Sequence, residues 1–127
     1  MFGITTKAQG DDGEARAWEH LRARGLVLVQ RNYRVAAGPR VRGGEIDLIA
    51  RDRDGTLVFI EVRSRADGRF GGAAGSISAA KQRSLVLAAQ HYLMTWRGPL
   101  PVCRFDVIAF DAGSIVWIRD AFRADTS

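Results

Sequence analysis

Hydrophobic and polar residues alternate over several short stretches, and two longer stretches have the spacing of amphipathic helices. The alternation predicts strands over residues 26–35, 43–50, 56–65, 102–110 and 114–118. The helical spacing predicts helices over residues 12–24 and 79–96. This order predicts an α/β (α+β) domain in which a mixed sheet of about five strands is flanked by helices. Because a helix connects strands 56–65 and 102–110, we expect them to be parallel neighbours.

Residues typical of caps and turns mark the ends of these elements. Asp11 or Asp12 can cap the first helix, and Gly25 can end it. Ser76 or Ser78 can cap the second helix. The first strand is expected to be interrupted or twisted near residues 31–32.

Two neighbouring strands each carry an acid inside an apolar run, Asp47 in the first and Glu61 in the second. A carboxylate in such a place is unfavourable unless something cationic holds it. Gly55 suits the left-handed third position of a three-residue hairpin loop. That loop places Asp47 opposite Glu61 at about 5 Å between Cβ atoms, with Arg63 on the same face. Two carboxylates this close repel unless a proton or a cation lies between them.

A different turn would remove this arrangement. A two-residue Asp54-Gly55 turn shifts the pairing by one and puts Asp47 and Glu61 on opposite faces. We favour the three-residue loop because the alternative leaves two charges on separate apolar faces. The competing interpretation of the acids is ion pairing with arginines across the sheet. We favour a divalent metal, because two facing acids leave one carboxylate without a partner.

Three further charged residues each have two interpretations. The Asp11-x-x-Glu14 spacing fits a helix capping box, but Glu14 also shares a stripe with Trp18 and could face the sheet. Both possibilities stay open. Lys81 is either a solvated residue in the first helical turn or a site residue that follows the acidic strand. For Asp106, inside another apolar strand, we expect a structural ion pair with an arginine.

Composition limits the class of protein. With 127 residues, 46% hydrophobic and 26% charged, we expect one soluble globular domain over residues 1–127. No apolar run approaches the length of a membrane span, and residues 1–7 lack the apolar core of a secretory signal. Cys103 is the single cysteine, so neither a disulfide within the chain nor a cysteine-based metal site is expected. These features predict a cytoplasmic protein.

The net charge of +5 comes almost entirely from arginine, because Lys7 and Lys81 are the two lysines. Arginine is suited to forked contacts with phosphate. A GC-rich genome would also favour arginine codons, and both explanations stay open. The arginines that we expect to bind nucleic acid are Arg34, Arg42, Arg63, Arg65 and Arg69.

An ordered set of motifs resembles the YraN family of small bacterial proteins. The motifs lie at the helix start of residues 13–15 and at residues 31–34, 44–50, 59–65, 81–83 and 104–107, and the resemblance covers nearly the whole chain. That family is in turn similar to the PD-(D/E)XK nuclease superfamily, which includes archaeal Holliday-junction resolvases. The resemblance implies a restriction-endonuclease-like fold.

The resemblance also implies roles for individual residues. Asp47 matches the first metal-binding acid, Glu61 the second, and Glu14 the helix acid that completes the site. The implied cofactor is Mg²⁺ or Mn²⁺. Where the superfamily has a lysine, this chain has Arg63, which stays protonated and cannot act as a general base. Arg63 could still bind the scissile phosphate, with Lys81 supplying the missing ammonium.

Three functions follow as hypotheses. The first is a Mg²⁺-dependent endonuclease acting on DNA, branched or structured DNA included, with catalytic residues Glu14, Asp47, Glu61, Arg63 and Lys81. The second is a catalytically inactive nucleic-acid-binding module on a nuclease scaffold. The third is a protein-interaction domain. By analogy with junction resolvases, a homodimer is a further expectation.

Overall fold

The structure is a computed structural model that describes the backbone of residues 6–39, 42–65, 77–111 and 113–124. The elements are α1 (Thr6–Ala23), β1 (Val27–Val35), β2 (Gly44–Arg51), β3 (Leu57–Arg65), α2 (Ala79–Leu93), β4 (Cys103–Asp111) and β5 (Ser114–Phe122). This order of helices and strands is the one predicted from the hydrophobic pattern, so that prediction is confirmed.

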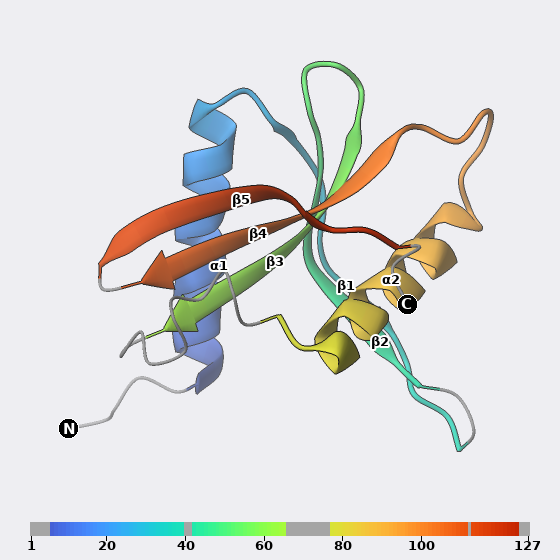
Figure 1. The fold of residues 1–127 in the computed structure, drawn as a ribbon, viewed down its shortest axis with the longest axis horizontal. Coiled ribbons are helices and arrows are strands. Elements are labelled where there is room, and N and C mark those ends of the chain that lie inside the picture. The colour runs from blue at the N-terminus through green and yellow to red at the C-terminus, as the bar shows by residue number, and fades with distance from the viewer. Residues whose placement is uncertain (1–5, 40–41, 66–76, 112, 125–127) are drawn as a thin grey trace.

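The strands form one five-stranded sheet in the order β1-β2-β3-β4-β5. Strands β3 and β4 are parallel, and the other neighbours are antiparallel. Figure 1 shows α2 connecting β3 to β4, with α1 and α2 on opposite sides of the sheet. The sheet is therefore mixed and flanked by helices, and the predicted parallel pair is confirmed.

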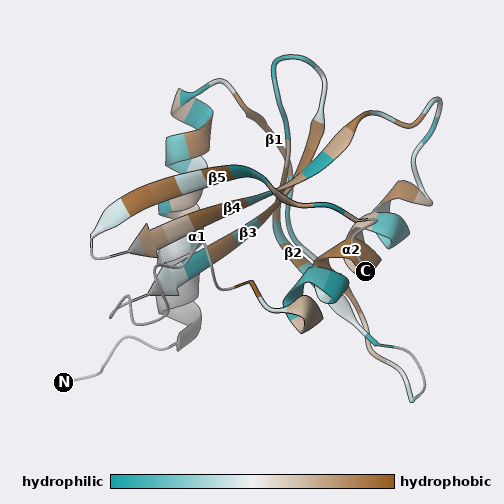
Figure 2. Cartoon of the chain, viewed as in Figure 1, coloured by the Kyte–Doolittle hydropathy of each residue, from teal (hydrophilic) through white to brown (hydrophobic). Residues whose placement is uncertain are grey.

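Each helix covers its own buried cluster. On the α1 side, Val58 and Ile60 of β3 pack against the helix. On the α2 side, Leu57 and Phe59 of the same strand join the other cluster. Figure 2 shows hydrophobic residues along β3 and β4, which with β2 are the inner strands of the sheet. Because successive side chains point to opposite faces, one strand supplies both cores.

The first helix begins earlier than expected. It starts at Thr6, so Asp11 and Asp12 lie inside it, and the predicted cap at either residue is wrong. Residues 6–11 have no apolar periodicity, but once a helix has formed, each added residue gains a hydrogen bond at little further cost. The predicted end is confirmed, because Gly25 has φ of +97° and donates its N–H to the Arg22 carbonyl over 3.0 Å.

The second helix begins as predicted and ends sooner. The Ser78 side chain accepts a hydrogen bond from the Lys81 backbone N–H over 3.1 Å, so Ser78 is the N-cap. The helix ends at Leu93 instead of at residue 96. The predicted irregularity of the first strand is also confirmed, because the pairing of β1 shifts after Leu28 and Asn32 has φ of +52°.

Candidate active site at the fork of the sheet

The turn between β2 and β3 is the three-residue loop. The Asp52 N–H donates to the Thr56 carbonyl over 2.9 Å, and the Gly55 N–H donates to the Asp52 carbonyl over 3.0 Å. Gly55 has φ of +89°, a conformation that glycine adopts without steric cost. The prediction of a loop over residues 53–55 is therefore confirmed, and the two-residue alternative is wrong.

This turn determines which residues face each other across the hairpin. The backbone pairing of β2 with β3 extends as far as Leu48 opposite Ile60. One further step in the same register places Asp47 across from Glu61. Side chains two residues apart on a strand share a face, so Glu61 lies on the side of Phe59, which is the side covered by α2.

The sheet forks at these two acids. Beyond them β2 stays paired with β1 to its first residue, whereas β3 stays paired with β4 to its last, and Figure 1 shows the two pairs diverging. The Asp47 side chain fills the gap, because its Oδ2 accepts the backbone N–H of Val62 over 2.8 Å. A backbone N–H at a diverging strand needs such a substitute partner. This hydrogen bond holds the Asp47 carboxylate at the fork.

Glu61 is the buried member of the pair, with 5% of its surface exposed. Burial raises its pKa to about 8, helped by the negative charge of Asp47 and by hydrogen bonding to it, while Lys81 acts in the opposite direction. Without a bound cation, the two acids together therefore keep a proton up to a higher pH than a lone glutamate does. This is the expected behaviour of two carboxylates that share one site.

The ammonium group of Lys81, in the first turn of α2, lies beside Glu61. The Lys81 Nζ lies 3.4 Å from Glu61 Oε2. Ser78, Lys81 and residues 61–64 line a cavity of about 460 Å³, and half-buried Arg63 is part of its wall. The start of a helix also carries partial positive charge. The cavity thus has acids that suit a cation and, beside them, two cations that suit an anion.

Comparison with known sequences identifies the family. The chain matches the model described as "Uncharacterised protein family UPF0102" over residues 13–110. The chain belongs to the UPF0102 family. This is the YraN family, so the resemblance recognised from the motifs is confirmed.

Relatives in the UPF0102 family match along most of their length. A UPF0102 protein of Methylibium petroleiphilum is 61% identical, over 95% of this chain and 98% of its own. One from Acidovorax sp. is 58% identical, over 94% of this chain and 88% of its own. One from Ralstonia pickettii is 52% identical, over 94% of both chains. No solved structure gives a significant match. Among the described helices, none is long and apolar enough to cross a membrane.

The UPF0102 match includes Glu14, the third acid proposed for the site. Glu14 is half-buried on α1, one turn before Ala17, which packs in the cluster on the α1 side. Within the described part of the chain, no three His, Cys, Asp or Glu side chains form a metal-binding group. The structure brings Asp47 and Glu61 together at the fork. The role of Glu14 as a third ligand stays a prediction.

The predicted nucleic-acid-binding arginines are spread over several elements. Arg34 and Arg42 are exposed on the β1–β2 hairpin, and Arg34 forms an ion pair of 3.5 Å with Glu45 across the two strands. Arg63 lines the acid cavity. Arg69 and the side chain of Arg65 lie outside the described residues. Contact of these arginines with nucleic acid stays a prediction.

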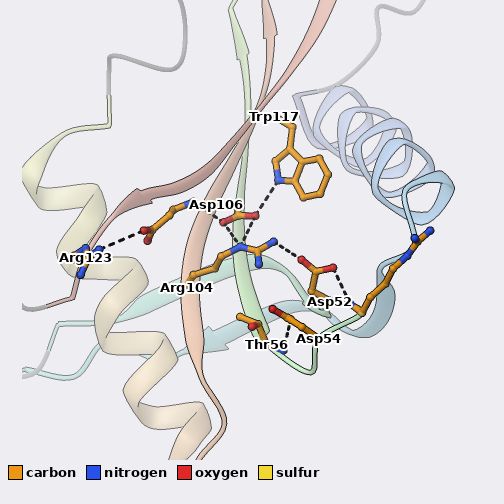
Figure 3. Close-up of polar contacts among 9 residues, drawn as sticks. Asp52, Asp54, Thr56, Arg104, Asp106, Trp117 and Arg123 are labelled. Carbon is orange, nitrogen blue, oxygen red and sulfur yellow. Dashed lines mark hydrogen bonds and ion pairs between the residues drawn. The ribbon is translucent and has the colours of Figure 1, made fainter.

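Asp106 has the structural role that was predicted for it. Arg104 Nε lies 3.0 and 3.2 Å from its two carboxylate oxygens, and Trp117 Nε1 donates to it over 2.9 Å (Figure 3). The Asp120 backbone N–H adds a further hydrogen bond of 2.9 Å, and Arg104 Nη2 reaches Asp52 over 2.8 Å. The Arg104-x-Asp106 spacing, which places both residues on one face of a strand, indicates the ion pair. The contacts with Trp117 and Asp52 had no signal in the sequence.

Proposed function

We propose that this protein is a metal-dependent endonuclease that hydrolyses phosphodiester bonds in DNA. The observation that carries the proposal is the meeting of Asp47 and Glu61 at the fork, with Lys81 beside them. The resemblance of the family to PD-(D/E)XK nucleases supports it. The net charge of +5 supports a polyanionic substrate.

The donor chemistry of the two acids fits a divalent metal. Carboxylate oxygens are ligands that Mg²⁺ and Mn²⁺ prefer. Mg²⁺ usually binds through one or two carboxylates, while waters and substrate phosphates complete its shell. Asp47 and Glu61 are therefore sufficient, and a third protein acid is not required. A cation would also take the place of the proton that Glu61 otherwise holds.

The residues at the site have separable tasks in this proposal. A bound metal supplies an activated water and stabilises developing negative charge. Asp47 and Glu61 hold it, and Glu14 orients the metal or the water from α1. Arg63 binds the phosphate oxygens, because a guanidinium is a fixed forked donor that does not release its proton. Lys81 supplies a second positive charge to the phosphate from the start of α2.

The test is a cleavage assay with Mg²⁺ or Mn²⁺ on duplex, flap and four-way DNA. Wild-type protein is expected to cut at least one of these, and EDTA is expected to stop the reaction. Asp47→Asn and Glu61→Gln should each lower the rate by about 100-fold or more, the scale expected for one electrostatic catalytic group. The matched control is Glu19→Gln, which changes an exposed acid paired with Arg22 on α1 and should cut normally.

Two outcomes would contradict the nuclease proposal. One is cleavage that survives in the double variant Asp47→Asn, Glu61→Gln, since this indicates a contaminating nuclease. The other is a wild-type protein that cuts none of the three substrates and gains no thermal stability from either metal.

A second candidate is a nucleic-acid-binding module without catalysis. The observation that favours it is Arg63, an arginine where related nucleases have a lysine. This module would bind DNA in EDTA, lose affinity steeply as salt increases, and tolerate Asp47→Asn. Fluorescence anisotropy at several salt concentrations measures this. Binding that is insensitive to salt would exclude it.

A further inference from the structure

A groove separate from the acid cavity runs along the outer face of α2. Its volume is about 650 Å³, and Arg123 and Ala124, which follow β5, form its other wall. The α2 residues that line it recur at helical spacing and form one stripe: Ala79, Gln82, Arg83, Val86, Leu87 and Gln90. Figure 1 likewise shows the described segment that follows β5 beside α2. A second cavity, of about 540 Å³, shares Arg123 and Ala124 and extends the groove to the start of β4.

The groove combines an apolar surface with positive charge. Val86 and Leu87 supply aliphatic side chains, and Arg83 and Arg123 are exposed. Among the described residues that line the 650 Å³ groove, none is acidic, and the sequence of α2 contains no acid. Arg123 has an ion pair with Asp120, but at 3.8 Å between two exposed side chains it is weak and replaceable. The groove is therefore suited to an anion that also has an apolar part.

An unpaired nucleic-acid strand has this combination. Its bases present flat apolar faces that can lie on aliphatic side chains, and its phosphates can bind guanidinium groups. A duplex keeps its bases stacked on one another, so it offers no base faces to Val86 and Leu87. The volume of the groove is in the range of about 300–1,000 Å³ that is usual for ligand sites.

The groove also adjoins the acid cavity. The first turn of α2 contributes Lys81 to the cavity and Ala79 and Gln82 to the groove. From Lys81 to Gln90 the helix advances about 14 Å, since each residue rises by about 1.5 Å. A strand within a duplex advances about 3.4 Å per base, so an unpaired and more extended strand places at most roughly four nucleotides over this distance. A strand that leaves the acid cavity along α2 would enter the groove.

We propose that the groove binds up to about four unpaired nucleotides next to the phosphodiester held at the acid cavity. The substrate class is then DNA with a single-stranded arm, such as a flap or a gapped duplex. This substrate assignment rests on the proposed nuclease function, but binding of the strand itself does not.

The test measures the binding of a labelled oligothymidylate and of a blunt duplex in EDTA by fluorescence anisotropy. Arg83→Glu with Arg123→Glu should weaken binding of the oligothymidylate by about tenfold or more and of the duplex by less than about threefold, because charge reversal removes phosphate contacts at the groove. The control is Arg24→Glu with Arg31→Glu, an equal charge change at exposed residues of the α1–β1 region, expected to weaken oligothymidylate binding by less than threefold. If the double variant does not fold, Gln90→Glu tests the same groove with little change in shape.

Three results would overturn the groove proposal. The first is an equal loss of affinity in the control pair, and the second is an equal loss for the duplex. The third is a change of oligomeric state in the groove variant, seen by sedimentation, which would assign the groove to contact between copies. Binding in EDTA is independent of cleavage, so the two proposals can fail separately. Strand binding that depends on the groove, in a protein that never cleaves, would remove the nuclease function and leave the groove assignment.

Discussion

Two acids are buried in one sheet, Asp106 and Glu61, and the groups of side chains around them stabilise the two in opposite ways. Asp106 is surrounded by donors, with Arg104, Trp117 and a backbone N–H all directed at its carboxylate. Glu61 instead faces a second acid, Asp47, and has an ammonium group at 3.4 Å. The first group is complete in the sense that each carboxylate oxygen of Asp106 accepts hydrogen bonds from donors already in the fold. The second is incomplete without a proton or a metal ion, which is typical of a functional site.

The largest effect is expected at the complete group. Asp106→Asn removes one charge of a buried network and leaves Arg104 with less compensation, so the free energy of unfolding should fall by about 3–5 kcal/mol. Urea denaturation measures this, and added Mg²⁺ should not change the loss. Asp120→Asn, at an exposed side chain nearby, is the control and should cost under about 0.5 kcal/mol. An Asp106→Asn protein as stable as wild type would show that this network does not hold the fold.

The two groups should also respond to pH with opposite signs. The pKa of Glu61 is raised from 4.5 to about 8, so its contribution to stability is full below pH 4.5 and is lost as the pH rises through 8. The pKa of Asp52 is lowered from 3.8: burial acts to raise it, but the Arg53 N–H and Arg104 together outweigh burial. Its contribution is present above pH 3.8 and is lost as the pH falls.

Urea denaturation in EDTA at a series of pH values measures this difference. Wild-type stability should fall by on the order of a few kcal/mol between about pH 5 and pH 9. Glu61→Gln should remove this alkaline loss and keep the loss in acid. A wild-type profile that is flat on the alkaline side would show that the acids at the fork do not share a proton.

Metal should stabilise the incomplete group alone. Mg²⁺ at 100 times its dissociation constant should raise the free energy of unfolding by about 2.7 kcal/mol, because it binds the folded chain. Asp47→Asn should abolish this gain, while Asp120→Asn should keep it. Thermal melts with Mg²⁺ and with EDTA provide the measurement. Coincident melts for wild type would count against the metal site.

The smallest effect is expected from Lys81→Met. The side chain is 37% exposed, so loss of its ion pair with Glu61 should cost less than about 1 kcal/mol. The sharper result is a change in the pH profile: Lys81 holds the pKa of Glu61 down, so the alkaline loss should move to higher pH. Arg83→Met, on another side of the same helix, should leave the profile where it is. An unmoved profile in Lys81→Met would mean that the ammonium does not act on Glu61.

Most of the fold and the centre of the site could be predicted from local signals. Alternating residues indicated each strand, and the helix between two of them indicated the parallel pair. Gly55 indicated the length of one turn, and that turn alone determined that Asp47 meets Glu61. A single glycine was informative because a shift of one residue in a strand moves every side chain to the other face.

Features that depend on distant segments could not be predicted. The start of α1 was missed because residues 6–11 carry no apolar pattern. The distance between Lys81 and Glu61 depends on where α2 begins after the connection from β3, and no local pattern encodes it. The groove requires Arg123 to lie beside α2, although the two are separated by β4 and β5 in the sequence.

The hydrogen bond from the Val62 N–H to Asp47 gives one side chain two duties. The Asp47 side chain bonds the backbone where the pairing of β2 with β3 ends, and in the proposed reaction it also supplies a carboxylate to the metal. Asparagine keeps an oxygen that can accept this N–H, whereas alanine leaves the amide without its acceptor. Asp47→Asn is therefore expected to stop the proposed reaction and keep the hydrogen bond to Val62, whereas Asp47→Ala is expected to lose both. An alanine variant that loses activity would report on both at once, and the asparagine variant alone separates them.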